Sequence, residues 1–337
     1  MTNSATVSGL GQETGVLFLH AQTSLHPGSG TALGTVDLPI QRERHTQWPI
    51  VAGSALKGVL RDCCREKAKE QYQDKDEDDS QAEGPQKRTR SRRQQANEDD
   101  PLLTAVFGPG KPDESSDHAG AACVTDARIL AFPVRSLRGV FAWATCPAVL
   151  ERLNRDLALA GRETIVLPDG PERDKAHVSE GSSLLVDGKH LVLEESEFER
   201  SGDASTVAAW IAENAVADEA TRRRLQTHLV VLTDDDFTHF VRHATEIVAR
   251  IGLNYEQKTV RQKALFYQEF LPPETLLYSL LLANPSRRRD QPMTAGEVLA
   301  YLHERLAEVP VLQIGGDETT GKGLCGVRLV NGKAGGR

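Results

Sequence analysis

The chain has 337 residues, of which 39% are hydrophobic and 26% charged, and its formal net charge is −8. This length suits one large domain or two of ordinary size, and the composition allows a sizeable core. No apolar run is long enough to span a bilayer, and the negative charge argues against broad, nonspecific nucleic-acid binding without excluding a local basic groove.

The cysteines and the first residues indicate a cytoplasmic protein. The five cysteines are scattered and form no C-x-x-C pair, which is typical of reduced thiols. The first fifteen residues, MTNSATVSGLGQETG, lack a basic stretch followed by an apolar one, so no secretory signal is expected.

The first third of the chain contains a strand, a helix and a polar segment. Residues 15–25 alternate as a strand does, and after a glycine-rich turn GSALKGVLRDCC places apolar residues at helical spacing. Ser54 is the expected N-cap of this helix, and Lys57 and Arg61 share the face away from the leucines. Residues 66–100 are almost devoid of apolar side chains, which predicts a disordered or lid-like insertion.

The middle of the chain mixes strands with helices. Two strands are expected at 127–135 and 139–145, followed by a helix that ends near Gly161. Residues 162–204 are polar, and only 189–196 reads as a strand. Helical patterns and a short strand follow up to residue 232.

Thr233 and three aspartates predict the start of a helix that the apolar spacing extends through Ile251. His239 and His243 lie four residues apart on it, but the glutamate of a zinc-protease helix is missing, so a solvent-facing pair is expected. The remaining expected elements are a polar loop at 254–263, strands at 264–272, 276–283 and 324–330, and a helix from a Thr294–Glu297 capping box to about residue 308. This mixed order predicts an α+β fold.

The stretch IGGDETTGKG at residues 314–323 is one residue short of a phosphate-binding P-loop. Gly323 stands where a P-loop carries the Ser or Thr that ligates magnesium, and a strand rather than a helix is expected after it. Two interpretations remain on spacing alone. The stretch is either a glycine-rich hairpin turn or a loop whose backbone N–H groups bind phosphate.

Five segments then carry a resemblance. They are HPGSGTALGTVDLPIQRE (26–43), GSALKGVLR (53–61), DARILAFPVRSLRGVFAWATCP (126–147), ALFYQEFLPPETLLYS (264–279) and IGGDETTGKGLCGVRL (314–329). In this order they resemble the RAMP superfamily and, within it, the backbone subunits of the type III-B CRISPR effector, the Cmr complex.

The resemblance implies an RRM-like, ferredoxin-like palm with an inserted thumb and lid-like segments. The palm would comprise residues 15–65 with the catalytic loop, 101–161, 205–249 with helices and a strand, and 271–330 with the glycine-rich loop. The thumb would fall at 250–270, and 66–100 and 162–204 would be insertions.

The resemblance also implies a function. Such a subunit polymerises along the guide CRISPR RNA (crRNA) in a helical filament of its own copies, together with other Cmr complex subunits. It cleaves complementary single-stranded target RNA at regular intervals with a divalent metal, Mg²⁺ or Mn²⁺. Two alternatives stay open: a non-catalytic crRNA-binding scaffold of a related CRISPR complex, and a stand-alone, metal-independent nuclease that matures guide RNA. No membrane partner is expected.

Asp37 matches the family's catalytic aspartate, which would hold the metal or orient the ribose 2′-OH; the alternative is an aspartate bonded to its own loop. His26 is either a proton donor or phosphate contact, or an imidazole packed in the turn. In the thumb, Glu256 could reach a neighbouring subunit's cut site, and Lys258 and Arg261 could touch the duplex. The alternative for all three is a solvated loop charge.

Binding along an RNA backbone needs donors and positive charge but no base code. Aromatic content is only 5%, which is low for a protein that grips bases by stacking, and Trp48 and Trp143 are expected in the core. The expected RNA-binding residues, besides Lys258 and Arg261, are Arg42, Ser54, Lys57, Arg61, Gly315, Gly316, Gly321, Lys322 and Gly323.

Overall fold

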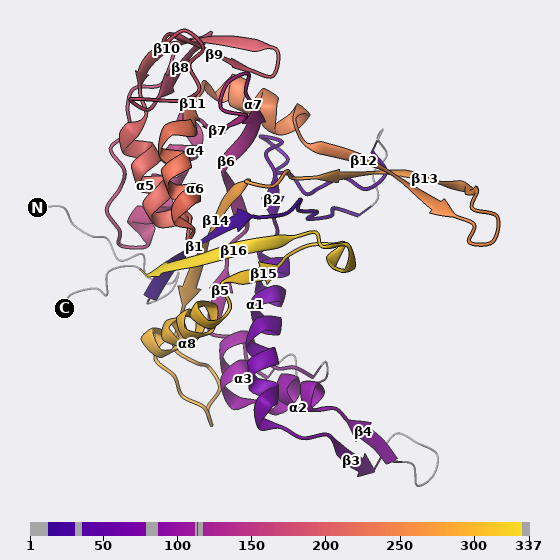
Figure 1. Cartoon of the computed structure of the whole chain (residues 1–337). Coiled ribbons are helices and arrows are strands. Elements are labelled where there is room, and N and C mark those ends of the chain that lie inside the picture. The colour runs from indigo at the N-terminus through magenta and orange to yellow at the C-terminus, as the bar shows by residue number, and fades with distance from the viewer. Residues whose placement is uncertain (1–12, 31–35, 79–86, 112, 114–116, 332–337) are drawn as a thin grey trace, which may run out of the picture.

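The structure is a computed structural model that describes residues 13–30, 36–78, 87–111, 113 and 117–331, with the backbone alone described at 76–78, 87–89 and 261–263. The fold mixes helices and strands, in line with the predicted α+β class, and its main feature is a twelve-stranded sheet (Figure 1). The strand order is β15-β16-β1-β14-β6-β7-β11-β8-β10-β9, with β2 paired to β6 and β5 to β14. Within this sheet, the β7–β11 and β8–β10 pairs are parallel and the other described ladders are antiparallel.

The strands of this sheet are β1 (Glu13–Ala21), β2 (Ile50–Val51), β5 (Ala122–Val124), β6 (Ala127–Arg135), β7 (Phe141–Thr145), β8 (Lys175–Val178), β9 (His190–Leu193), β10 (Ser196–Asp203), β11 (Leu229–Val231), β14 (Leu276–Ala283), β15 (Val311–Gln313) and β16 (Leu324–Asn331). The helices are α1 (Gly53–Ala68), α2 (Arg92–Asp99), α3 (Pro101–Phe107), α4 (Pro147–Leu159), α5 (Ser205–Ala215), α6 (Glu219–His228), α7 (Asp234–His243) and α8 (Ala295–Glu308), with short 3₁₀ turns η1 (Lys69–Gln71) and η2 (Glu318–Thr320). Within the described ranges, none of the helices is both long and apolar enough to cross a membrane.

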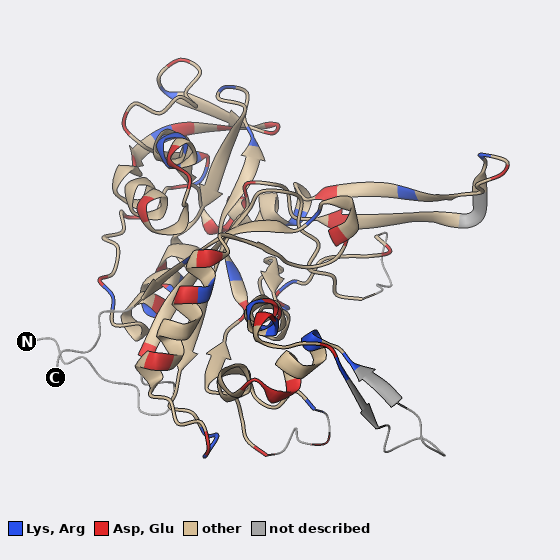
Figure 2. Ribbon diagram, turned by 60° about the horizontal axis from the view of Figure 1, so that its bottom comes forward, with Lys and Arg blue, Asp and Glu red and all other residues tan. Residues whose placement is uncertain are grey.

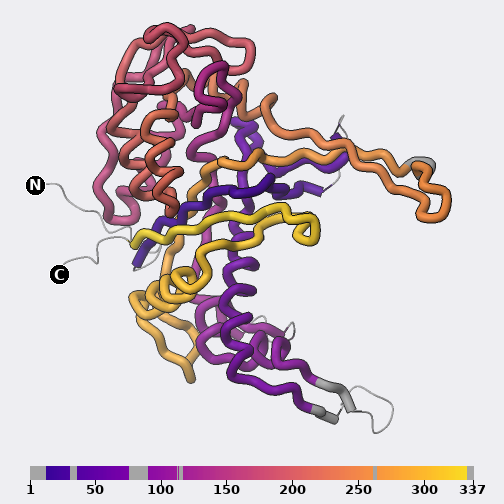
Figure 3. Tube along the Cα trace, viewed as in Figure 1, coloured from indigo at the N-terminus to yellow at the C-terminus, as the bar shows by residue number. Residues whose placement is uncertain are grey.

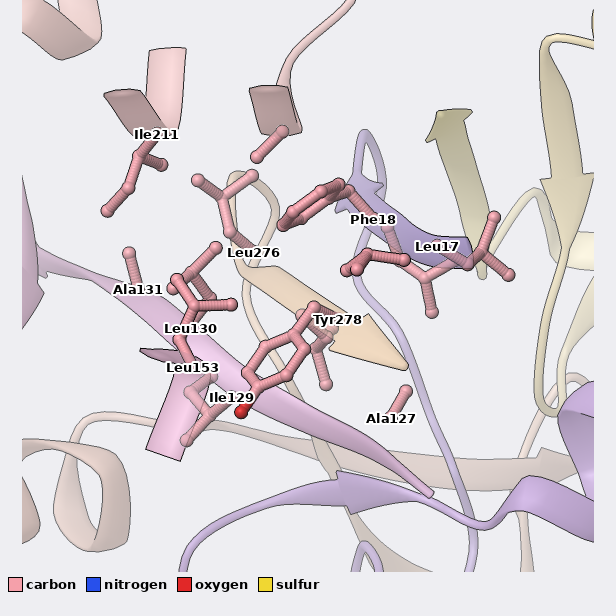
Figure 4. Close-up of a cluster of buried hydrophobic side chains, with 14 of the residues drawn as sticks. Leu17, Phe18, Ala127, Ile129, Leu130, Ala131, Leu153, Ile211, Leu276 and Tyr278 are labelled. Carbon is pink, nitrogen blue, oxygen red and sulfur yellow. The ribbon is translucent and has the colours of Figure 1, made fainter. Parts of the chain in front are cut away.

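The core lies between the central strands and the helices that cover them. Strands β1 and β14 are buried along most of their length, so their sequences read as continuous apolar runs such as LLYSLLLA. Figure 4 shows side chains of β1, β6 and β14 meeting Leu153 of α4 and Ile211 of α5. The hydroxyl of buried Tyr278 donates to Asp156 (3.0 Å), which also pairs with Arg128 (2.8 Å). Trp48 and Trp143 are buried, as expected.

Two hairpins project from the body on the same side (Figures 1 and 3). The longer one pairs β12 (Glu246–Leu253) with β13 (Val260–Phe270), and the shorter one pairs β3 (Lys75–Asp78) with β4 (Lys87–Arg90). The longer hairpin forms a separate two-stranded sheet, and the base of β13 touches the loop that follows β1. Its position therefore depends on contacts at that base.

The prediction of disorder is wrong for much of residues 66–100. Helix α1 continues to Ala68, and Ser91 caps α2, where its side chain accepts a hydrogen bond from the amide of Gln94 (3.2 Å). Helix α2 packs against the protein through an amide and a small side chain, because Gln95 and Ala96 are both buried. Residues 79–86 of that segment lie outside the described residues.

The polar segment 162–204 contains more strand than predicted. Besides β9, near the expected 189–196, it forms β8 and β10, which extend the main sheet beyond β11. Only one or a few side chains of each strand face the core, as with Phe198 in SEFERSGD, so a strongly polar sequence can still pair its backbone.

The helix predicted through Ile251 ends earlier. Helix α7 stops at His243, and Glu246 begins β12, so Val248 and Ile251 lie on an exposed strand instead of an apolar helix face. The three-residue spacing of these two side chains fitted a helix, but backbone pairing with β13 decides the outcome. Residues 250–270, where a thumb is expected, lie in a hairpin that starts four residues earlier, at Glu246.

Candidate functional site

Three segments meet at the base of the long hairpin: the loop after β1 that carries His26 and Asp37, strand β13, and the glycine loop, Gly315–Gly323. Leu25 exchanges backbone hydrogen bonds with Leu271 (2.9 and 2.8 Å), and Leu38 pairs in parallel with Gln268. The amide of Gly316 donates to the carbonyl of His26 (3.0 Å). The fold therefore brings together residues from both ends of the chain, as the predicted site required.

Asp37 is exposed and is held by the hairpin rather than by its own loop. Its Oδ2 accepts a hydrogen bond from the backbone amide of Tyr267 (2.7 Å), and the amide of Leu38 donates to the carbonyl of Tyr267 (3.0 Å). Its other carboxylate oxygen has no protein partner in the described part of the chain. Asp37 thus offers one oriented, solvent-facing oxygen.

The described residues around Asp37 limit how a metal could bind, because they form no cluster of protein ligands. Among the described residues, no three or more His, Cys, Asp or Glu side chains form a metal-binding group. Mg²⁺ needs no such cage, because it keeps several waters and uses one or two carboxylates together with substrate phosphates. The free oxygen of Asp37 fits that mode of binding.

His26 is only 8% exposed and is built into the turn. Its Nδ1 lies 2.7 Å from the carbonyl oxygen of Glu269, so Nδ1 carries a proton, and its ring lies 5.4 Å from that of Phe270. A side-chain carbon on Gly28 would approach His26 Nε2 to 2.8 Å, so glycine is needed at that position. This burial favours the packed-imidazole interpretation of His26 over that of a free proton donor.

Backbone conformation and close packing explain two glycines of the glycine loop. Gly315 and Gly323 have φ values of 79° and 76°, and a Cβ on them would come within 2.3 Å of the His26 carbonyl oxygen and 2.0 Å of the Ile314 carbonyl oxygen. The amides of Gly316, Gly321 and Gly323 donate to protein carbonyls, so the predicted outward-turned N–H groups are not available at these three positions. Any phosphate contact of the loop must rely on other atoms.

Lys322 joins the glycine loop to the loop after β1 and to β13. Its Nζ donates to the Ser24 hydroxyl (3.1 Å) and lies 5.2 Å from the centre of the Phe270 ring, which Arg250 approaches from β12 at 5.5 Å. An ammonium has three donors, so Lys322 can add a phosphate contact without losing the bond to Ser24. The aromatic ring thus holds two cations next to the glycine loop.

The sequence predicts that Arg42 binds RNA, but its side chain is bonded within the protein. Its guanidinium donates to the carbonyls of Gln47 (2.8 Å) and Val241 (2.9 Å) and pairs with Glu269. Glu269 is 6% exposed and also accepts from the Thr245 hydroxyl (2.8 Å) and the Ile40 amide (3.1 Å). Because both terminal nitrogens of its guanidinium bond groups inside the protein, Arg42 does not present them to an RNA phosphate in this conformation.

Of the three residues of α1 predicted to bind RNA, Ser54 and Arg61 differ from the prediction. Its N-cap is Ala52, and Ser54 is an exposed residue of the first turn that makes no cap bond; Asp126 instead accepts from the Gly53 amide (2.7 Å). Arg61 donates to Asn97 Oδ1 (3.1 Å) and the Gly108 carbonyl (3.0 Å), so it joins α1 to α2 and α3.

Lys57 keeps its cationic potential. It has no hydrogen-bond or ion-pair partner among the described residues and is half-buried. Burial lowers the pKa of Lys57 from its usual value, and neighbouring Arg61 lowers it further, while Cys123 acts in the opposite direction. A half-buried ammonium without a partner gains from a phosphate ligand.

Figure 2 shows basic and acidic residues at the tip of the long hairpin. The tip joins the start of β13, whereas Asp37 binds Tyr267 near the end of that strand. Glu256 is exposed in the turn, its amide bonded to Asn254 Oδ1 (3.0 Å), and Lys258 lies 4.5 Å from the centre of the exposed Tyr255 ring. The side chain of Arg261 lies outside the described residues. Within one chain these groups do not join the site, and their predicted contacts require a neighbour.

His239 and His243 are both exposed, with ring centres 4.9 Å apart, so the expectation of a solvent-facing pair is confirmed. Burial and the neighbouring His239 lower the pKa of His243 from its usual value.

Sequence reasoning missed the residues that hold the site together: Tyr267, Gln268, Glu269 and Asp317. All four are polar or amphipathic residues in segments that were already quoted, but nothing local distinguishes them. An acid among the aromatic residues of YQEF is a weak signal of burial that could have identified Glu269.

Comparison with known proteins identifies the family of this chain. The model of the RAMP superfamily matches residues 18–326. The chain belongs to the RAMP superfamily. Among RAMP proteins it is 36% identical over 313 residues, covering 92% of this chain and 94% of the other, to the CRISPR system Cmr endoribonuclease Cmr4 of Pyrococcus furiosus. It is 24% identical over 339 residues, 93% of this chain and 96% of the other, to the CRISPR system CMR subunit Cmr4 of Saccharolobus solfataricus.

Solved RAMP structures are similar over the whole chain. The crystal structure of oligomeric Cmr4 from Pyrococcus furiosus is 30% identical, with a TM-score of 0.65 and coverage of 95% of this chain and 98% of the other. A subunit in the cryo-EM structure of the type III-B Cmr-beta bound to cognate target RNA, 19% identical with a TM-score of 0.67 and coverage of 95% and 98%, shows the same fold.

Proposed function

We propose that this chain is the backbone subunit of a type III-B CRISPR effector complex, which polymerises along crRNA and cleaves complementary target RNA at regular intervals. The observation that carries the proposal is the exposed carboxylate of Asp37, held by the Tyr267 amide at the junction of the first loop, the glycine loop and the hairpin. The relative of 36% identity is named a Cmr endoribonuclease. The structural relative of 30% identity is described as oligomeric, which supports self-assembly.

The order of elements supports a ferredoxin-like palm. Strand β1, helix α1, strands β6 and β14, helix α8 and strand β16 follow each other as β-α-β-β-α-β, and the strands lie side by side as β16-β1-β14-β6. The hairpin β12–β13 is inserted before β14 and is the thumb in this assignment. The site at its base then lies where thumb and palm join.

RNA cleavage at this site needs little beyond placement. The ribose 2′-OH loses its proton and attacks the adjacent phosphorus, the bond to the 5′ oxygen breaks, and that oxygen takes a proton from water. The products are a 2′,3′-cyclic phosphate and a 5′-hydroxyl. The free oxygen of Asp37 accepts or orients the 2′-OH proton, and Lys322 lies close by to offset phosphate charge. A divalent ion held by Asp37 through its hydration shell would add further charge neutralisation.

The role of the metal can be tested on the reconstituted complex of this chain, guide RNA and partner subunits. We expect target cleavage in Mg²⁺ or Mn²⁺ and at least about a 100-fold loss in excess EDTA, restored by adding Mg²⁺ back. Guide binding measured in parallel serves as the control, because chelation should leave it intact. Undiminished cutting in EDTA would contradict the metal assignment and favour a metal-independent nuclease.

The RNA backbone contacts should depend on Lys57 and Lys322. We expect the double variant Lys57→Ala/Lys322→Ala to weaken guide binding. The slope of log affinity against log salt should become shallower by about 1 for each lysine, which corresponds to one lost phosphate contact each. Lys189→Ala is a matched control, because that ammonium already pairs with Glu199 (2.7 Å) on another part of the sheet. The measurement is a filter-binding salt titration, and an unchanged slope would contradict the phosphate contacts.

A further inference from the structure

Asp317 links the glycine loop to both strands of the long hairpin. Its Oδ1 pairs with Arg250 NH1 of β12 (3.2 Å), and its Oδ2 accepts a hydrogen bond from the side-chain amide of Gln268 of β13 (2.6 Å). Gln268 is only 4% exposed, and Arg250 also approaches the Phe270 ring. These three residues, Asp317, Arg250 and Gln268, are called the Asp317 link below.

The loop holds Asp317 in an orientation that favours this contact. Its φ of 65° lies in the left-handed region, which aspartate and asparagine tolerate better than most residues. The amides of Thr320 (3.0 Å) and Lys322 (3.2 Å) both donate to its carbonyl oxygen, so its backbone is fixed while the carboxylate reaches the hairpin. Asp317 is therefore not a free acidic charge facing the RNA.

The Asp317 link and the support of Asp37 rest on adjacent residues of β13. Gln268 is preceded in β13 by Tyr267, whose backbone amide and carbonyl hold Asp37 and Leu38. A shift of Gln268 along or across β13 must therefore move the Tyr267 amide. Because β12 and β13 form a separate two-stranded sheet, the hairpin depends on such base contacts for its direction.

We propose that Asp317 is a positioning residue for RNA cleavage, which sets the hairpin against the glycine loop and thereby places the carboxylate of Asp37. This inference rests on the proposed function of the site. The Asp317 and Arg250 side chains are 20% and 25% exposed, so their ion pair stabilises the fold only modestly. Its effect on cleavage is larger, because in-line attack is sensitive to displacements of about 1 Å.

The test compares four variants in the reconstituted complex. Asp317→Asn keeps the acceptor for Gln268 and tolerates the left-handed backbone but loses the charge, and Arg250→Met keeps an apolar stem over Phe270. Arg250→Lys is the conservative variant. Glu219→Gln is the matched control, because it removes an exposed ion pair with Arg223 (3.2 Å) on α6. For each, single-turnover cleavage with saturating target, the positions of the cuts, guide affinity and thermal midpoint are measured.

We expect Asp317→Asn and Arg250→Met to cut about 10-fold more slowly, with guide affinity within about threefold of the parent. The thermal midpoint should move by no more than about 3 °C. Arg250→Lys should restore most of the rate, and Glu219→Gln should cut like the parent.

Parent-like cutting by Asp317→Asn and Arg250→Met, while Asp37→Ala fails to cut, would overturn the positioning role and leave the proposed function standing. Equal losses of cleavage and guide binding would also overturn it, because they indicate a purely structural role. Failure of the parent complex to cut at all would overturn the proposed function itself, and the role of Asp317 with it.

Discussion

Replacing Asp37 with alanine is expected to abolish target cleavage, by at least about 100-fold, while guide binding and assembly stay intact. The carboxylate is exposed and contributes a single hydrogen bond to the fold, from the Tyr267 amide, so its loss should cost little stability. The measurement is single-turnover cleavage of labelled target RNA by the reconstituted complex.

Asp37→Asn is the matched control for this prediction. The asparagine oxygen can still accept the Tyr267 amide, so the loop stays in place while the negative charge is lost. We expect this variant to be nearly as inactive as the alanine variant. Undiminished cutting by Asp37→Ala would contradict the catalytic assignment, and full activity of Asp37→Asn alone would show that position rather than charge matters.

Replacing Arg42 with methionine is expected to lower the free energy of unfolding by about 3 kcal/mol. The change leaves the Glu269 carboxylate buried, with only the Thr245 hydroxyl and the Ile40 amide as partners. It also removes the bond to the Val241 carbonyl that ties α7 to the first loop. Urea unfolding of the isolated chain measures the effect.

Arg223→Met provides the comparison, because its ion pair with Glu219 is exposed and should contribute less than about 1 kcal/mol. A stable Arg42→Met variant that binds guide RNA more weakly than the parent would contradict the structural role and return Arg42 to the RNA-binding residues.

Much of the fold could be predicted because several segments carry a clear local pattern. Strands such as Leu276–Ala283 and the capping box of Thr294 and Glu297 are local features, and the structure confirms both. The hairpin strand β12 could not be predicted in the same way. Its apolar residues at 247, 248 and 251 fit a helix as well as a strand, and the choice depends on pairing with β13, which follows a turn.

Some residues of the candidate site could also be named from the sequence, and others could not. The exposed Asp37 and the half-buried Lys57 could be named from the chain, Asp37 through the resemblance and Lys57 through its place in the helical pattern. The fate of Arg42 and Arg61 could not, because an arginine in sequence looks the same whether it faces a phosphate or bonds carbonyls contributed by distant segments. The glycine loop shows a further limit, since positive φ and close backbone approach explain Gly315 and Gly323 without a ligand.

The most direct test of the account maps the cuts made in a long labelled target by the complex of this chain, guide RNA and its partner subunits. Separation on a denaturing gel should show evenly spaced cuts within the guide-complementary region, each leaving a 5′-hydroxyl end, and none when the chain carries Asp37→Ala. An uncut target, or the same ladder from the Asp37→Ala complex, would contradict the claim that this chain cleaves RNA at the base of its hairpin.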